Sequence, residues 1–202
     1  MKQTDSDLKK YPTIGVCGLD CGLCPRYYTT GISRCPGCGG HDFLKKHPSC
    51  SFITCCVKKH NLEVCAQCSD FPCSKFISDG EYKQVKESSS YPPYRKVILN
   101  LNFIKEQGIE KFAEQQEKRI KLLETMIENF DDGRSKSFYC KATALIDLVK
   151  LDDSLDMAFQ KIKSDKIKPD DTKIKAKILK DILNEIALKD GIELIKKMKL
   201  FC

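Results

Sequence analysis

The sequence predicts a mainly α protein, in which a small, irregular, cysteine-rich metal-binding module is followed by an α-helical domain. Two observations support this class. Eleven of the 13 cysteines lie in the 57 residues from Cys17 to Cys73, where glycine and proline are frequent and aliphatic residues are sparse. Beyond residue 93, apolar residues recur three and four positions apart, as on one face of a helix. We divide the chain into a flexible N-terminus (1–13), the metal-binding module (14–87), a linker (88–93) and the α-helical domain (94–202).

The module has too few aliphatic side chains to be stable on a hydrophobic core alone. Bound metal would help, since structural zinc contributes about 10–16 kcal/mol of apparent binding energy to the folding of zinc-finger peptides. Short helices are expected over 42–46, 54–60 and 73–78. In the helical domain we expect helices over 94–107, 109–130, 137–150, 153–164 and 171–189. The last should carry its apolar face on Ile174, Ile178, Ile182 and Ile186.

Composition and charge limit the cellular environments and the kinds of partner that fit this protein. No apolar run approaches the roughly 20 residues needed to span a bilayer, so we expect no membrane association. The polar first residues lack the apolar core of a signal peptide, which predicts a cytoplasmic protein whose thiols stay reduced. The net charge of +7 is spread over both halves, with acidic and basic residues interleaved along the helices. This pattern is typical of solvated helix faces and argues against nucleic-acid binding.

The segment CPGCGG at 35–40 is the most specific motif. Two cysteines separated by proline and glycine form a knuckle, because the proline fixes one dihedral angle and the glycines allow positive φ. Backbone N–H groups can then turn towards the sulfurs, as in sites that hold zinc or a single iron. The pair Cys65 and Cys68 could complete a four-thiolate site with Cys35 and Cys38.

The segment CGLDCGLC at 17–24 forms a second motif with the spacing C-x3-C-x2-C. Radical enzymes that use S-adenosylmethionine hold a [4Fe–4S] cluster with this spacing, but the strands and helices that alternate in those enzymes are missing here. Zinc and a non-radical [4Fe–4S] cluster both fit. A fourth ligand would come from a later cysteine: Cys50, Cys55, Cys56 or Cys73. We favour Cys73, because the preceding proline fixes its approach.

The adjacent thiols Cys55 and Cys56 cannot easily point to one ion. We interpret them as one ligand and one buried structural thiol. Alternatively, one of them is a nucleophile or the two bind a soft metal ion. The basic residues 58–60 would lower the pKa of a nearby thiol. His41 and His47 flank the knuckle, and each could replace a cysteine as a ligand.

These motifs resemble the cysteine-rich domain-of-unknown-function family 3795 of bacteria and archaea over about residues 14–120. The matching segments are CGLDCGLCPRYY, SRCPGCGG, PSCSFITCCVKK and VCAQCSDFPCSKF, followed by NLNFIKEQGIEKF. Many members carry another cysteine pair after the helix that follows, where this chain has IKLL, so no ligand is expected there. The resemblance implies metal binding, usually taken to be zinc, and supplies no established activity.

Two functions from different classes fit the sequence. The first is a zinc-stabilised interaction or regulatory module, with a helical half that could present a groove to a protein partner. The second is a [4Fe–4S] redox or sulfur-handling accessory protein or enzyme. We favour zinc, because the knuckle suits tetrahedral coordination. Whether any reaction is catalysed stays open, and no catalytic residue is assigned. The predicted metal ligands are Cys17, Cys21, Cys24, Cys35, Cys38, Cys50, Cys55, Cys56, Cys65, Cys68 and Cys73.

Overall fold

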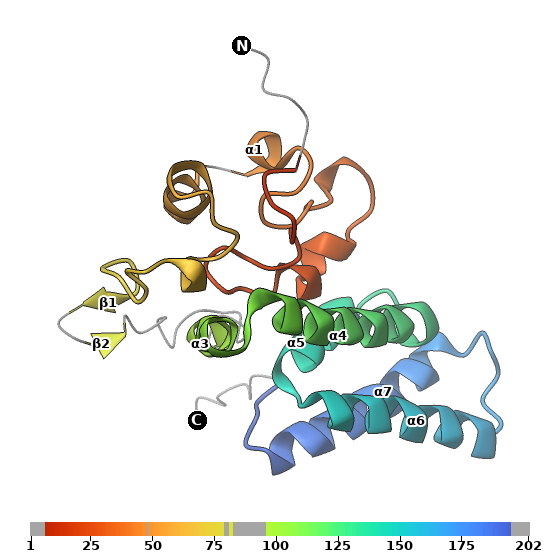
Figure 1. Ribbon diagram of the computed structural model, residues 1–202. Coiled ribbons are helices and arrows are strands. Elements are labelled where there is room, and N and C mark those ends of the chain that lie inside the picture. Colours follow the sequence, from red (N-terminus) through yellow and green to blue (C-terminus); the bar gives the residue numbers. More distant parts are fainter. Residues whose placement is uncertain (1–6, 48, 79–80, 83–95, 195–202) are drawn as a thin grey trace, which may run out of the picture. The chain divides into compact units, whose positions relative to one another are not determined.

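The computed structural model describes residues 7–47, 49–78, 81–82 and 96–194 (Figure 1). The chain forms two compact units, Met1–Glu117 and Lys118–Cys202, and the boundary between them falls inside the longest helix. The predicted linker and Cys202 lie outside the described residues. The mainly α class with an irregular cysteine-rich segment is confirmed.

The first unit is built from short turns of helix joined by loops. Its 3-10 helices are η1 (Cys21–Leu23), η2 (Pro25–Tyr28), η3 (Gly31–Ser33) and η5 (Cys65–Gln67), and η4 (Thr54–Lys59) is a π-helix. The short α-helices are α1 (Phe43–Lys46) and α2 (Ser51–Ile53), and the longer ones are α3 (Val97–Gln107) and α4 (Ile109–Phe130), of which the first part belongs to this unit. The predicted helix over 73–78 is wrong, because its end forms strand β1 (Ile77–Ser78), which pairs antiparallel with β2 (Glu81–Tyr82).

Helix α3 and the start of α4 complete the core of the first unit. The segment before α3 contributes the large buried side chains Ile14, Val16, Phe43, Ile53, Val64, Phe71 and Phe76. The buried members that α3 and α4 add to this core are Val97, Leu101, Ile104, Ile109 and Phe112. The first unit therefore extends past the predicted module boundary at residue 87, because the loops need a helical apolar face to pack against.

Residues 7–13, expected to be a flexible lead-in, are instead bonded to the module. The backbone N–H of Leu8 donates to the carbonyl of Gly39 (2.6 Å), and the carbonyl of Pro12 accepts from the N–H of Cys38 (2.7 Å). The Glu63 carboxylate accepts two further backbone N–H groups of this segment. Cys38 and Gly39 of the knuckle are thus tied to the beginning of the chain.

The second unit contains the rest of α4 with α5 (Lys136–Leu145), α6 (Leu148–Ser164) and α7 (Thr172–Lys189), and α6 packs along α7. The predicted helix over 137–150 is interrupted after Leu145. Asp147 starts α6 there, because its carboxylate accepts from the backbone N–H groups of Val149 (2.9 Å) and Lys150 (3.4 Å) as an N-cap.

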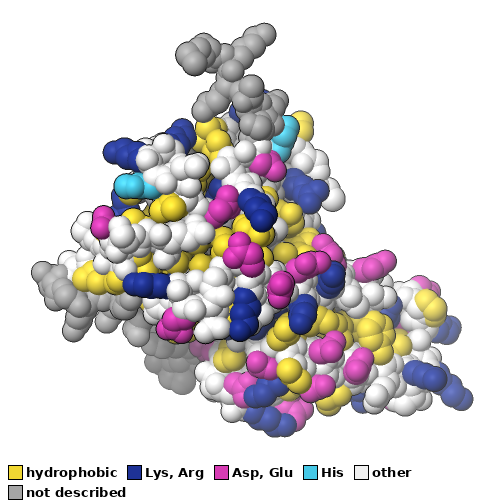
Figure 2. Space-filling model, in the orientation of Figure 1, with side chains coloured by type: hydrophobic (Ala, Val, Ile, Leu, Met, Phe, Trp, Pro, Cys, Tyr) yellow, Lys and Arg dark blue, Asp and Glu magenta, His cyan; other side chains and the backbone are white. Residues whose placement is uncertain are grey.

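The buried face of α7 differs from the predicted isoleucine ladder. Ile178 is buried, but Ile174 is 45% exposed. The remaining buried positions of α7 are Ala176, Leu179, Leu183 and Ala187. Alanine and leucine occupy much of this buried face, so part of the predicted row of isoleucines lies at its edge. On the face drawn in Figure 2, acidic and basic side chains are interspersed over the helices. No described helix combines the length and apolar character needed to cross a membrane.

Candidate metal centre

A buried carboxylate positions the CGLDCGLC segment. Asp20 is 7% exposed and accepts hydrogen bonds from two side-chain amides. Asn100 of α3 donates from Nδ2 to Oδ2 (3.0 Å), and Gln116 of α4 donates from Nε2 to Oδ1 (3.1 Å). The same amides also reach the backbone, at the carbonyls of Gly18 (2.8 Å) and Thr13 (3.1 Å). Two helices thereby fix the loop that carries the first three cysteines.

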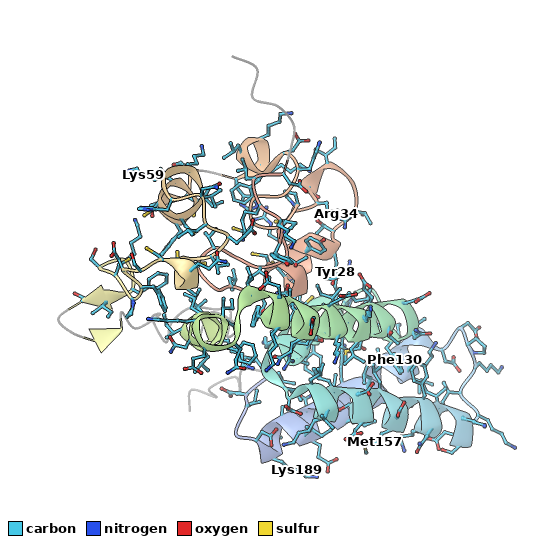
Figure 3. The ribbon with its side chains drawn as sticks, in the orientation of Figure 1. Tyr28, Arg34, Lys59, Phe130, Met157 and Lys189 are labelled. Carbon is cyan, nitrogen blue, oxygen red and sulfur yellow. The ribbon has the colours of Figure 1, made fainter. Side chains whose placement is uncertain are left out.

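The approach of this loop to α3 requires glycine. Gly18 has φ of +89°, and a Cβ there would lie 2.5 Å from the carbonyl oxygen of Val97 and 2.7 Å from Cγ of Leu101. Tyr28 of η2, labelled in Figure 3, holds the other side of the loop. Its hydroxyl donates to the carbonyl of Gly22 (2.9 Å).

The CPGCGG segment forms the predicted knuckle. Gly37 and Gly39 adopt φ of +84° and +76°, which only glycine takes without strain. The backbone N–H of Val16 donates to Sγ of Cys38 (3.4 Å). This is the N–H to sulfur contact expected at a thiolate ligand, and here the donor comes from outside the knuckle.

Cys38 forms a hydrogen-bonded thiol pair with Cys21. The Cys21 thiol donates to Cys38, and this bond, with burial, raises the pKa of Cys21 well above its usual value. The same bond lowers the pKa of Cys38 to about 6. Burial opposes that decrease, while the charge of Lys9 and the N–H of Val16 support it. Of the two thiols, Cys38 is thus the one that loses its proton more readily.

A second hydrogen-bonded pair is formed by Cys56 and Cys65. The Cys65 thiol donates to Cys56, which lowers the pKa of Cys56 and raises that of Cys65. The backbone N–H of Cys65 donates to the carbonyl of Val16 (2.9 Å). Val16 therefore bonds to both pairs, through its N–H to Cys38 and through its carbonyl to Cys65.

Cys17 follows Val16 in the chain and interacts with both pairs. Burial raises the pKa of Cys17 to about 11, and negative charge on Cys38 and Cys50 adds to this increase. Charge on Cys17 and Cys73 in turn raises the pKa of Cys65 beyond the effect of its bond to Cys56 and of burial. These thiols form one electrostatically connected group.

A mixed thiol and imidazole contact lies at the entry to the knuckle. Sγ of Cys35 is 3.1 Å from Nε2 of His47, whose ring stacks on Phe43 with centroids 4.5 Å apart. Burial and the charge of Arg26 lower the pKa of His47, which favours the neutral imidazole that a metal ligand requires. Burial raises the pKa of Cys24, and charge on Cys35 contributes to the increase.

The cysteine-rich segment is similar to a known protein family. Residues 13–78 match the model of a family described as "Protein of unknown function (DUF3795)". The resemblance inferred from the cysteine motifs is thereby confirmed over these residues. No curated protein and no solved structure matches the chain significantly. The DUF3795 segment contains all eleven clustered cysteines, whereas α3 and α4, which complete the core of the first unit, lie beyond it.

The contacts group the thiols of the DUF3795 segment differently from the sequence-based expectation. That expectation joined Cys35 and Cys38 with Cys65 and Cys68, and Cys73 with the C-x3-C-x2-C motif. The structure instead bonds the knuckle to that motif through Cys38 and Cys21, and bonds the middle cysteines to the last cluster through Cys56 and Cys65. We therefore place Cys21, Cys24, Cys35, Cys38 and His47 in a first group around one hydrogen-bonded pair, and Cys17, Cys50, Cys56, Cys65 and Cys73 in a second group around the other. The two groups are not electrostatically separate, because Cys17 also interacts with Cys21 and Cys38.

The remaining candidates are less connected. Cys55 and Cys68 make no side-chain bond to another described thiol, so of the vicinal pair only Cys56 is bonded to a further cysteine. His41 is exposed and lies 3.2 Å from the Asp42 carboxylate, whereas His47 faces a thiol. The two histidines that flank the knuckle are therefore not equivalent.

The donor chemistry of the segment fits a thiolate-binding metal, although the ligands are not fully gathered. No described cysteine forms a disulfide, and Cys38, Cys56 and Cys65 are buried. Among the described residues, no three Cys, His, Asp or Glu side chains are close enough to hold an ion as they stand. Four of the donors form two hydrogen-bonded thiol pairs, and those that bind a metal would have to release their protons.

Sequence reasoning missed the residues that hold these thiols in place. Asp20 lies between two predicted ligands in the sequence. Asn100 and Gln116 are polar residues on otherwise apolar helix faces, and this break in the apolar pattern could have identified them as residues with a buried hydrogen-bonding role. Lys9 is 4% exposed and affects two thiols, yet nothing in the predicted lead-in distinguished it from its neighbour Lys10.

Proposed function

We propose that the first unit is a zinc-binding module, in which zinc held by thiolates fixes the irregular loops for a structural, interaction or regulatory role. The observation that carries this proposal is the contact between the two strongest motifs. The Cys21 thiol bonds to Cys38 of the knuckle, whose sulfur also accepts a backbone N–H. Buried thiols without disulfides, held by N–H groups, are the donors that zinc prefers.

The first proposed centre uses Cys21, Cys24, Cys35 and Cys38, with His47 beside Cys35 as a further donor. Mixed sulfur and nitrogen donors suit tetrahedral zinc. When bound, zinc would supply a fixed point of attachment for the two cysteine motifs and would displace thiol protons. The Asp20 bonds orient the Cys21 side, and the N–H of Val16 holds the Cys38 sulfur.

The second proposed centre uses Cys17, Cys50, Cys56, Cys65 and Cys73. It brings the π-helix η4 together with the last cysteine cluster. Because this segment has little regular secondary structure, metal at both centres would add to its stability.

The donors of this second centre are all sulfur, which favours an iron–sulfur cluster as the alternative to zinc. Four thiolates without histidine are the usual ligands of a [4Fe–4S] cluster, and five thiols are connected here. A cluster at this position would make the protein a redox or sulfur-handling accessory. The first centre, with an imidazole beside its thiols, retains its preference for zinc.

Elemental analysis and visible absorption of protein purified without air test the proposal. We expect a colourless protein with about two zinc ions per chain. A brown protein with iron and a broad visible band would replace zinc by an iron–sulfur cluster. A protein without tightly bound metal, whose thiols react freely while its fold is unchanged, would refute metal binding altogether.

The vicinal cysteines offer a matched pair of variants. Cys56→Ser should remove about one equivalent of zinc, because Cys56 bonds to Cys65 in the second group. Cys55→Ser changes the neighbouring thiol, which is not connected to that group, and should keep the full metal content. Equal metal loss in both variants would contradict the assignment of the second centre.

A further inference from the structure

A pocket of about 380 Å³ lies beside the knuckle in the first unit. The start of the chain lines it with Asp7 and Pro12, the knuckle region with Pro36 and His41, and α1 with Lys46. Cavities that hold small molecules have volumes of about 300–1,000 Å³, so this pocket has room for one. None of the described residues that line it belongs to the proposed metal centres.

Close backbone packing holds the walls of this pocket in place. Gly40 also lines it, and a Cβ there would overlap with the carbonyl oxygen of Pro36 and lie 3.2 Å from Cβ of Pro12. The backbone N–H of Cys35 donates to the carbonyl of Arg26 (2.9 Å) and closes the loop between these two residues, which carries the other lining side chains. The walls are therefore formed before a ligand binds, which lowers the cost of binding.

Two cationic side chains line the pocket without a carboxylate partner. Arg34, labelled in Figure 3, donates from Nε to the carbonyl of Tyr27 (3.2 Å), and its guanidinium group lies over the Tyr27 ring, 5.3 Å from the centroid. The Nζ of Lys46 donates to the carbonyl of Arg34 (3.2 Å). Both groups are thus anchored by neutral atoms, and among the described residues neither forms an ion pair. The two Nη groups of Arg34 donate to no described residue, so they are available to a ligand.

The nearby acidic side chains do not cancel this charge. Asp42, which follows the knuckle, pairs with Lys45 (2.8 Å) and contacts the His41 ring (3.2 Å). Asp7 is the only carboxylate among the described residues that line the pocket, and it is exposed. The lining therefore has a net positive charge even when His41 is neutral, which favours an anionic ligand.

We propose that this pocket binds a small phosphate monoester through the Arg34 guanidinium and the Lys46 ammonium group. A phosphate monoester such as phosphoserine carries a charge of about −1.5 to −2 at neutral pH, which two cations match better than the single charge of a carboxylate. The planar guanidinium can donate two parallel bonds to phosphate oxygens, and the lysine adds a point charge. The side chains of Pro12, Tyr27 and Pro36 offer apolar surface to the organic part of the ligand. This site goes beyond the proposed zinc binding and does not depend on it.

An NMR titration of the full chain, with phenyl phosphate as the probe, tests this site. At about 0.15 M salt, where the attraction of distant charges is screened, the backbone amides of Arg34, Gly40 and His41 should shift saturably. Benzoate has the same ring but one negative charge, and should bind about tenfold more weakly. Inorganic phosphate lacks the ring and should also bind more weakly. Benzoate or inorganic phosphate binding as tightly as phenyl phosphate, or no saturable shift at these amides, would overturn the proposal.

Two adjacent, exposed lysines of α1 provide a matched control. Lys46→Gln removes a cation that lines the pocket, whereas Lys45→Gln makes the same change at a lysine that pairs with Asp42 and does not line it. We expect Lys46→Gln and Arg34→Gln each to weaken phenyl phosphate binding about tenfold or more, as for the loss of a hydrogen bond to a charged group. Lys45→Gln should change it by less than about twofold. Equal weakening in Lys46→Gln and Lys45→Gln would reveal attraction by the overall charge alone and would overturn the site.

Discussion

Replacing Asn100 by alanine should release the CGLDCGLC loop from α3. The side-chain amide of Asn100 is buried and makes two hydrogen bonds, one to the carbonyl of Gly18 (2.8 Å) and one to the carboxylate of Asp20 (3.0 Å). A neutral bond contributes about 1 kcal/mol and a bond to a charged group about 1.5–3 kcal/mol. The expected destabilisation of this loop is therefore about 3 kcal/mol, since Gln116 still holds the other carboxylate oxygen.

Hydrogen exchange followed by mass spectrometry isolates this effect, because the two units are read separately. In Asn100→Ala, the amides of residues 14–24 should exchange about 100-fold faster, since every 1.4 kcal/mol corresponds to a factor of ten. Peptides from α7 should not change. The control is Asn102→Ala, a half-buried asparagine on the same helix whose side chain bonds to no described residue. Exchange in residues 14–24 within about threefold of this control would refute the reasoning.

Three further substitutions test local packing and pH dependence. Gly18→Ala should destabilise the protein by about 1–3 kcal/mol more than Gly31→Ala in thermal denaturation, because both glycines have positive φ but only Gly18 faces α3 at close range; equal losses would contradict the packing. Tyr139→Phe should cost about 1 kcal/mol, since the buried hydroxyl donates to the carbonyl of Phe130 (3.0 Å), and a neutral effect on urea unfolding would show that this bond is dispensable. Asp147→Ala should cost about 1 kcal/mol at neutral pH as the N-cap of α6 is lost. Burial raises the pKa of Asp147, but bonds from the backbone N–H groups that follow outweigh it and lower the pKa. The stabilisation is thus present above the ordinary aspartate pKa of about 4 and is lost as pH falls through the folded value, so the variant and the wild type should converge in acid.

Local signals made the helices beyond residue 96 largely predictable. The limits of α4 match the sequence-based expectation, because Gly108, with φ of +89°, ends α3 just before it. The break between α5 and α6 was missed, since Asp147 lies inside an apolar run and acts through its cap geometry. The buried face of α7 was assigned from isoleucines alone, whereas Ala176 and Ala187 share the contact and leave Ile174 exposed.

The cysteine-rich segment was predictable in composition but not in pairing. Spacing located the knuckle and the C-x3-C-x2-C motif, whereas the contact between them depends on the fold. Val16 bonds to Cys38 through its N–H and to Cys65 through its carbonyl, and neither bond leaves a trace in cysteine spacing. The same holds for Asp20, whose amide partners are 80 and 96 residues away in the chain.

Zinc K-edge X-ray absorption of the full chain tests the central claim most directly, because it reports the atoms bound to the metal. Zinc at the proposed centres should have nearest neighbours that are mainly sulfur at about 2.3 Å, with a minor nitrogen contribution at about 2.0–2.1 Å from His47. In a Cys38→Ser, Cys56→Ser double variant, one sulfur at each centre is removed and the sulfur contribution should fall. A shell of oxygen and nitrogen alone in the wild type, or a sulfur shell unchanged in the double variant, would contradict the account.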